Sequence, residues 1–482
     1  MLVACGGSSA LQVSSDGSNG VAVNGTPGPT PFISLLQLTG PSLASLAAVS
    51  WSIEPKPGGA SKPVSARYAL AALQRRNWVS ENSVKVPVFG LYAGVVNQVD
   101  VHLEGSDGSR QDLTVHIRTD PYEDPLGVYD RPTTLQARPV GSALDFDFIA
   151  LKPAVASVVV VDTDGEVRWV GTSAPSQSTI FTANGFVVGS GTSTQMARLE
   201  LDGEVDGFQL DDPGVIDFTH NIDPGKTGLL AEFDVQGDVD ATVAEISPTG
   251  TLLAGWKMGD LLSAYMSAEG DDPSQFVRPG VDWFHVNAAT YDPRDDSVMV
   301  SSRENFVIKI DYATGTPIWI LGDPTKYWAQ FPSLRAKALT LVGGGEYPIG
   351  QHATSITSEG LLMLFNDGTP SLNQPKGAPA GQALGASVVS AYQIDPVART
   401  AREVWRFDHQ PELSSEFCSS VYQASSSYLV NYAMADNATT ARIVGLDANR
   451  QEVFELSFAN PGGGCATSWN AVPVPFEQLQ FD

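Results

Sequence analysis

The feature that most constrains the fold is a strand-and-turn unit that recurs along the chain beyond residue 130. Each copy has an apolar run, a tight turn with glycine or a polar substitute, and a short strand that often carries an aromatic residue. The six copies lie at residues 161–169, 199–205, 246–252, 310–319, 394–405 and 446–454. A single unit of this kind cannot bury its apolar face, so neighbouring copies must pack together. The repeat therefore predicts an all-β chain built as a β-propeller.

A second unit, a turn followed by a strongly apolar strand, lies between the copies. It is found at residues 185–188, 228–231, 297–300, 360–365 and 428–432. Six turn units predict a six-bladed propeller over residues 126–482. Gly (46) and Pro (32) are plentiful and the charged fraction is only 17%, which favours turns and strands over helices. One short helix is expected in a loop, at residues 257–268.

Residues 33–125 predict a separate small domain that resembles a β-sandwich. Residues 99–103 and 113–117 alternate around a Gly-rich turn, a pattern typical of a hairpin. The histidines of this hairpin, His102 and His116, are expected to be strand residues without a catalytic role.

The first residues predict export. Leu-Val-Ala-Cys at residues 2–5, followed by two glycines, resembles the lipobox of bacterial lipoproteins with Cys5 as the lipidated residue. Residues 6–32 are Ser, Gly, Asn, Thr and Pro with few large apolar groups, so residues 1–32 are expected to be a lipobox remnant and a flexible tether. We expect a periplasmic or outer-membrane-anchored lipoprotein whose only membrane attachment is the lipid.

The net charge of -26 limits the partners. Such a surface repels phosphate backbones, so no nucleic acid partner is expected. No run approaches the roughly 20 apolar residues of a membrane-spanning helix. The sequence is compatible with a homodimer.

Three of the six histidines occupy matching positions in successive repeats. His220, His285 and His352 each open a run that leads into the turn before an apolar strand. Equivalent positions of successive blades face one central channel, so the three imidazoles are expected to converge there. The alternative is three structural histidines satisfied by local hydrogen bonds, which matched positions disfavour.

Hairpin register adds a positive charge to this cluster. If residues 285–303 form a simple hairpin centred at Arg294, Arg303 lies across from His285. Asn287 is two residues beyond His285 and is expected on the same face. A bulge of one residue would break this geometry.

A patch with arginine, asparagine and histidine donors suits a small oxyanion, and a neutral imidazole can be a nucleophile. A three-histidine zinc site is the alternative, but an arginine facing it would oppose a cation, so no metal is expected.

No Gly-rich phosphate loop opens a helix, which disfavours a nucleotide donor. No cofactor is expected.

These residues carry a family resemblance. Residues 282–304, which contain His285, Asn287 and Arg303, resemble the signature of the bacterial arylsulfate sulfotransferases, as do residues 318–324. Residues 218–223 and 350–353 fit the same family, and residues 88–92 resemble its N-terminal β-domain.

The resemblance implies a six-bladed propeller that moves a sulfuryl group from an aryl sulfate to a phenol. His352 would be the histidine that is transiently sulfurylated, which gives ping-pong kinetics. His220, His285, Asn287 and Arg303 would hold and polarise the sulfuryl oxygens.

Two further sets of residues are left with alternatives. Trp283, Phe284 and Tyr347 are candidates to bind the aromatic ring only because they are near in sequence. Cys418 and Cys465 open segments of the last two repeats and either form a disulfide or stay as two free buried cysteines.

Two other functions fit the same sequence. A non-catalytic propeller that binds anionic ligands or a partner protein would explain the fold but not the convergent side chains. An aryl sulfate hydrolase would use the same site, with water in place of the phenol.

Overall fold

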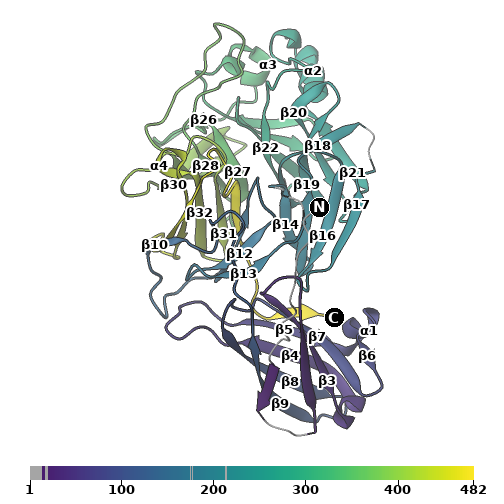
Figure 1. The fold of residues 1–482 in the computed structure, drawn as a ribbon. Coiled ribbons are helices and arrows are strands. Elements are labelled where there is room, and N and C mark those ends of the chain that lie inside the picture. The colour runs from purple at the N-terminus through teal and green to yellow at the C-terminus, as the bar shows by residue number, and fades with distance from the viewer. Residues whose placement is uncertain (1–12, 17–19, 174, 176, 212–213) are drawn as a thin grey trace.

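The computed structural model describes residues 13–16, 20–173, 175, 177–211 and 214–482 (Figure 1). These residues form a β-domain, at the bottom of Figure 1, and a ring of sheets above it. The all-β prediction and the propeller prediction are confirmed.

The N-terminal domain consists of two sheets. The first has the order β1 (Val13–Asp16), β9 (Arg110–Arg118), β8 (Val96–Gly105), β4 (Leu46–Ile53), β5 (Val64–Ala69), β36 (Leu479–Phe481). The second has the order β2 (Ala22–Pro27), β3 (Ile33–Thr39), β7 (Ser83–Phe89), β6 (Val79–Ser80). Apolar side chains of both sheets, among them Trp51, Val86 and Val101, share one buried core. The predicted hairpin is the β8–β9 pair, and its His102 and His116 lie in these strands.

Two predicted boundaries are wrong where the chain is described. Residues 13–16 and 22–27 were expected in the flexible tether, but they form β1 and β2, and β2 pairs with β3. Both are outermost strands, where backbone hydrogen bonds suffice without the apolar side chains that the prediction required. The propeller was expected to continue to residue 482, but β36 returns to the N-terminal domain and pairs with β5 in parallel (Figure 1). Cys5 lies outside the described residues.

Six sheets of four or five strands, counted over the described residues, make up the propeller. Three of them are β13 (Val167–Val170), β12 (Val159–Asp162), β11 (Phe148–Lys152), β35 (Asn470–Val474); β14 (Thr179–Thr182), β15 (Gly185–Gly189), β16 (Gln195–Glu200), β17 (Val205–Gln209); and β18 (Val215–Pro224), β19 (Leu229–Val235), β20 (Asp238–Ile246), β21 (Leu252–Lys257). The other three are β22 (Val286–Asp292), β23 (Ser297–Ser302), β24 (Val307–Asp311), β25 (Pro317–Leu321); β27 (Gln351–Ile356), β28 (Leu362–Asn366), β29 (Val388–Asp395), β30 (Thr400–Phe407), β26 (Thr340–Leu341); and β31 (Ser420–Ala424), β32 (Ser427–Met434), β33 (Thr440–Leu446), β34 (Glu452–Ala459), β10 (Thr133–Gln136).

The two ends of the propeller segment close the ring. Strand β35, near the end of the chain, pairs with β11 from its beginning, while β10 pairs with β34. Each pairing satisfies a sheet edge that would otherwise be open.

The recurring turn unit is one hairpin of each blade, and the six hairpins are β12–β13, β16–β17, β20–β21, β24–β25, β29–β30 and β33–β34. In all six copies the turn contains a residue with positive φ, namely Gly165, Gly203, Gly250, Gly315, Arg399 and Arg450. Glycine adopts this left-handed conformation at no steric cost, and the two arginines adopt it in the last two copies.

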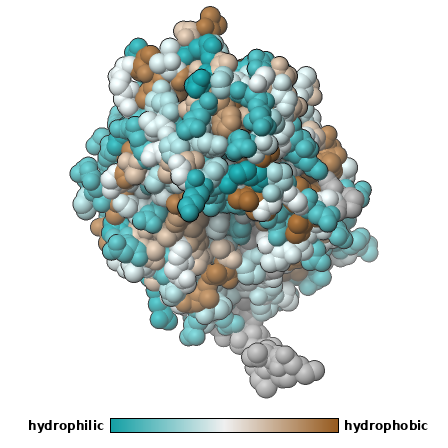
Figure 2. All heavy atoms as spheres, turned by 90° about the horizontal axis from the view of Figure 1, so that it is seen from above, coloured by the Kyte–Doolittle hydropathy of each residue, from teal (hydrophilic) through white to brown (hydrophobic). Residues whose placement is uncertain are grey.

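Helices are few and short in the described part of the chain. They are η1 (Pro41–Ser45), α1 (Leu70–Arg75), α2 (Met258–Ala268), η2 (Pro273–Gln275), η3 (Tyr327–Gln330), α3 (Pro332–Arg335) and α4 (Ala435–Ala438). Helix α2 is the loop helix that the sequence predicted. None of these helices is both long and apolar enough to cross a membrane. Seen from the α2 and α3 end, hydrophilic residues are spread over the surface and hydrophobic ones occur singly or in small groups (Figure 2).

Candidate active site

The three matched histidines lie on neighbouring inner strands, each beside an irregularity in the strand pairing. His220 lies in β18, His285 directly precedes β22, and His352 lies in β27. The register shifts between Phe218 and Ile222, between Val286 and Ala288, and between His352 and Ser355. Bulges bend a strand and redirect side chains, and they are common beside active sites. The regular strand pairing of the repeat is therefore interrupted beside each of the three histidines.

The histidines and Arg303 converge as the sequence predicted. The rings of His220 and His285 are 4.9 Å apart between centroids and meet edge to face. Arg303 and His285 lie close enough to His352 to lower its pKa. His285, His352 and Arg303 likewise lie close enough to His220 to lower the pKa of that ring.

The prediction that Arg303 lies across from His285 is confirmed, although the reason given for it is incomplete. The backbone N–H of Arg303 donates to the carbonyl of His285 at 3.1 Å, and Val286 pairs with Ser302. The far end of the hairpin pairs Asp292 with Ser297, so its turn is centred half a residue later than expected. A bulge at Asn287 corrects this offset.

The guanidinium of Arg303 is buried and only partly satisfied. Nη2 donates to Oε1 of Glu304 at 2.6 Å, whereas Nε and Nη1 have no hydrogen-bond partner among the described residues. Buried donors without partners are costly, so their retention points to an anion that accepts from them.

Asn287 is buried and links two blades. Its Nδ2 donates to the carbonyl of Gln351 at 2.8 Å, while its Oδ1 has no partner in the described structure. Because an amide nitrogen carries two hydrogens, one remains for a ligand.

His352 is a neutral imidazole with a defined tautomer. Its Nδ1 lies 2.9 Å from the carbonyl of Gly350, which can only accept, so Nδ1 carries the hydrogen and Nε2 the lone pair. Burial is the main cause that lowers the pKa of His352 to about 3, with contributions from Arg303 and His285. Burial likewise holds the pKa of His220 well below its usual value, so both rings are uncharged near neutral pH.

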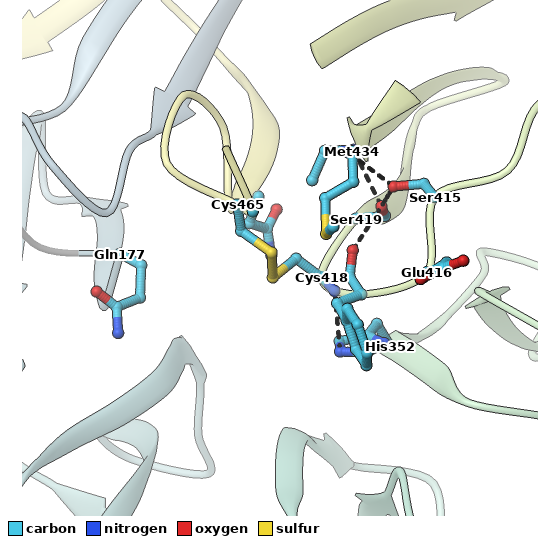
Figure 3. Close-up of a disulfide and its surroundings, with 12 residues drawn as sticks. Gln177, His352, Ser415, Glu416, Cys418, Ser419, Met434 and Cys465 are labelled. Atoms are coloured by element: carbon cyan, nitrogen blue, oxygen red, sulfur yellow. Dashed lines mark hydrogen bonds between the residues drawn. A yellow bond between two sulfur atoms is a disulfide. The ribbon is translucent and has the colours of Figure 1, made fainter. Parts of the chain in front are cut away.

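The two cysteines form a disulfide beside His352. Cys418 and Cys465 are joined, with their Cα atoms 6.3 Å apart, so of the two alternatives the structure has the disulfide (Figure 3). The backbone N–H of Cys418 donates to Nε2 of His352 at 3.2 Å. Ser415 and Ser419 fix this loop, because their hydroxyls bond each other at 2.8 Å and accept from backbone N–H groups at the end of β32.

Two carboxylates that the sequence analysis missed flank His285. Oδ2 of Asp282 is 2.8 Å from Nδ1 of His285, and Oδ2 of Asp240 is 3.4 Å from the same atom. Burial raises the pKa of Asp240 to about 7, and His285 opposes this shift. Asp282 precedes His285 by three residues, so its proximity to His285 could have been inferred from the sequence. Asp240 lies in β20 and is brought close to His285 only by the fold.

The aromatic candidates named from the sequence are not at the site. Trp283 and Phe284 are fully buried in an apolar core, and the hydroxyl of Tyr347 accepts from the backbone N–H of Leu341. Proximity in sequence did not bring the first two rings to the site, because Trp283 and Phe284 pack against each other in that core.

Two other half-buried rings border the polar cluster. The ring of Phe417 lies 5.4 Å from the guanidinium carbon of Arg303, and the ring of Trp469 lies 5.5 Å from that of His220. The disulfide ties together the segments that carry them, and the backbone N–H of Ser419 donates to the carbonyl of Trp469 at 3.1 Å.

Two groups among the described residues could in principle share a cation. They are Asp240 with Asp282 and His285, and His409 with Glu452 and Glu455. In the second group, Nη1 of Arg442 already lies 2.9 Å from Oε1 of Glu455.

Comparison with known proteins assigns the chain to a family. The sequence model described as Arylsulfotransferase (ASST) matches residues 142–462, two thirds of the chain. The chain belongs to the arylsulfotransferase family. A second model, described as the arylsulfotransferase Ig-like domain, matches residues 42–120 of the N-terminal domain.

Individual relatives match shorter stretches. The arylsulfate sulfotransferase AssT of Escherichia coli O6:H1 is 29% identical over 211 residues, and that of Lelliottia amnigena is 26% identical over 212 residues. Each alignment covers 40% of this chain and 32% of the relative. Among solved structures, the β-propeller domain of Swd1 from Myceliophteria thermophila covers 68% of this chain and 99% of its own at 11% identity, with a TM-score of 0.35. The designed Ika8 protein covers 68% of this chain and 96% of its own at 13% identity, with a TM-score of 0.32.

Proposed function

We propose that this protein transfers a sulfuryl group from an aryl sulfate to a phenol through a covalent sulfohistidine at His352. Membership of the arylsulfotransferase family supports the reaction. The observation that carries the proposal is a buried arginine with two unpartnered donors beside a neutral histidine.

In the first half-reaction, the Nε2 lone pair of His352 attacks sulfur. An N–S bond forms, the bond between sulfur and the aryl oxygen breaks, and the phenolate leaves with that electron pair. Nε and Nη1 of Arg303 donate to the sulfuryl oxygens, helped by His220 and the free N–H of Asn287. His285 gives a proton to the departing oxygen.

The second half-reaction runs in reverse with a new phenol. The phenol loses its proton to His285, its oxygen attacks sulfur, and the N–S bond breaks to return neutral His352. Because the donor product leaves before the acceptor reacts, we expect ping-pong kinetics.

Phe417 and Trp469 support an aromatic substrate. Both rings are half-buried at the border of the polar cluster, one beside Arg303 and the other beside His220. When the sulfuryl group is bound at Arg303 and His220, the aryl group attached to it extends towards the rings of Phe417 and Trp469 and can pack against them.

Release of a chromogenic phenol from an aryl sulfate, with and without a second phenol, tests the proposal. We expect about one equivalent of phenol to be released without the second phenol, and sustained release only with it, together with formation of its sulfate ester. Release at the same rate without the phenol, with inorganic sulfate as product, would support the hydrolase. Binding of aryl sulfate without release would support the non-catalytic propeller.

We also propose that the protein is exported and anchored by a lipid on Cys5, on the basis of the lipobox-like residues 2–5 alone. Mass spectrometry of the N-terminal peptide of the native protein tests this, and a mature chain that begins elsewhere overturns it. The disulfide beside His352 is consistent with an oxidising compartment.

A further inference from the structure

His285 differs from the other two histidines in the groups that surround it. Nδ1 of His352 donates to a backbone carbonyl, and Nδ1 of His220 lies 3.1 Å from the hydroxyl of Thr219. A carboxylate lies near Nδ1 of all three rings, with Asp367 at 3.4 Å from that of His352 and Asp240 at 3.9 Å from that of His220. Only Nδ1 of His285 is within close hydrogen-bond distance of one, at 2.8 Å from Oδ2 of Asp282. The three rings are thus equivalent in repeat position but not in environment.

Asp282 is itself held in place from another blade. Nδ2 of Asn373, in the segment between β28 and β29, donates to Oδ2 of Asp282 at 2.9 Å. The chain of contacts is therefore Asn373 to Asp282 to His285, and it runs from one blade into the next.

The same segment also fixes the partner of Arg303. The backbone N–H groups of Leu372 and Asn373 donate to Oε2 of Glu304 at 2.9 and 2.8 Å, and the hydroxyl of Ser371 donates to the carbonyl of Glu304. Oε1 of Glu304 accepts from Nη2 of Arg303. Asn373 thus bonds through its side chain to the carboxylate behind His285 and through its backbone to the carboxylate behind Arg303.

We propose that Asp282, held by Asn373, is a positioning residue that makes His285 the proton donor and acceptor for the aryl oxygen. This inference rests on the proposed sulfuryl transfer. A carboxylate at Nδ1 fixes the tautomer in which Nδ1 carries a hydrogen, so Nε2 is the nitrogen left for the substrate, and it stabilises the imidazolium that exists while Nε2 is protonated.

The proton balance closes over one cycle. The imidazolium of His285 gives its Nε2 proton to the aryl oxygen as the S–O bond breaks, and the ring becomes neutral. In the second half-reaction the acceptor phenol returns a proton to Nε2 as its oxygen attacks sulfur. Asp282 moves no proton in either step.

The other charged or titratable groups around His285 are less suited to this role. Asp240 faces it from β20 at 3.4 Å, but its pKa of about 7 leaves it partly protonated near neutral pH. The remaining groups are His220 from β18, His352 from β27 and Arg303 after β23, and none of them can balance a positive charge on His285.

The dependence of rate on the leaving group tests the proposal. Asp282→Asn keeps the shape of the side chain but removes its charge. We expect kcat/KM for unsubstituted phenyl sulfate to fall about 100-fold, because phenolate then leaves without a proton. Nitrophenyl sulfate, whose phenolate needs little protonation, should react at nearly the wild-type rate.

Asn373→Ala is the second variant and leaves the carboxylate of Asp282 in place without its Nδ2 partner. We expect a smaller loss with the same preference for the good leaving group. Asp296→Asn is the matched control. Asp296 lies in the turn between β22 and β23 and pairs with Lys226 on the surface, so we expect no change for either donor.

The outcomes separate this inference from the proposed function. An equal loss for both donors in Asp282→Asn, with unchanged thermal stability, overturns the positioning role. An unchanged rate for phenyl sulfate does the same. Wild-type protein that releases no phenol from any aryl sulfate overturns the proposed function instead.

Discussion

The backbone N–H of Cys418 donates a hydrogen bond to Nε2 of His352, the nitrogen that carries the ring's lone pair (Figure 3). The proposed nucleophile therefore contacts a residue whose position is set by a disulfide to Cys465. When Nε2 attacks sulfur, this N–H loses its acceptor and lies beside the sulfuryl oxygens, where it can donate to one of them.

The first prediction concerns this disulfide. Cys465→Ser should slow sulfurylation of His352, because the loop that carries the Cys418 N–H loses its covalent tether. Loss of the disulfide should also reduce the free energy of unfolding by about 2–4 kcal/mol. Single-turnover release of phenol and thermal unfolding measure the two effects separately. Reductant should slow the wild type but leave the variant unchanged; an unaltered rate in the folded variant contradicts the prediction.

The second prediction concerns the guanidinium. Arg303→Lys should lower kcat by about 10²- to 10³-fold, because an ammonium cannot present the Nε and Nη1 donors in one plane. Steady-state kinetics with one donor and one acceptor measure this. Arg294→Lys is the control, since Arg294 pairs with Asp292 at the other end of the same hairpin. A loss of similar size in the control would point to the hairpin and not to the site.

The third prediction identifies the nucleophile. Incubation with an aryl sulfate alone should add one sulfuryl group to the peptide that contains His352, detected by mass spectrometry. His352→Asn should abolish labelling and turnover, whereas His220→Asn should keep part of the activity. Labelling of another residue, or kinetics that require both substrates to be bound together, contradicts the assignment.

The fourth prediction concerns pH. The pKa of His352 is lowered to about 3, so its lone pair is available at any pH above that value. Sulfurylation by nitrophenyl sulfate, which needs little acid assistance, should therefore not decline between pH 7 and 5 through protonation of His352. An unperturbed histidine would lose most of its reactivity over this interval, since its pKa is about 6.5. Single-turnover rates at several pH values distinguish the two cases.

The sequence predicted most of the fold because the repeat is a local signal. The left-handed turn residues, such as Gly165 and Arg450, recur at one position of each blade and could be recognised without tertiary information. Strands β2 and β36 were missed for the opposite reason. β2 has few apolar side chains, and β36 pairs with a strand more than 400 residues away in the chain.

The site was predicted in part for a similar reason. The histidines and Arg303 lie on repeat positions or in one hairpin, so periodicity and register brought them together. Asp240, Asn373 and Trp469 come from other strands and long loops, and no sequence pattern relates them to His285 or His220. The bulges beside each histidine also have no sequence signal, yet the bulge at Asn287 aligns Arg303 with His285.

The last prediction concerns the aryl group. Phe417 and Trp469 lie on segments joined by the disulfide and border Arg303 and His220, so both are expected to contact the ring of the donor and of the acceptor. Trp469→Leu and Phe417→Leu should each weaken this contact by about 0.5–1.5 kcal/mol, a rise in KM of roughly two- to tenfold. The rise should be larger for naphthyl than for phenyl sulfate, because the larger ring covers more of the aromatic surface.

Trp405→Leu is the control, since Trp405 packs against Tyr428 on other strands of the propeller. Values of KM for both donors in all three variants measure the effect. A change in KM that is the same for naphthyl and phenyl sulfate would show that these rings act on the fold and not on the substrate.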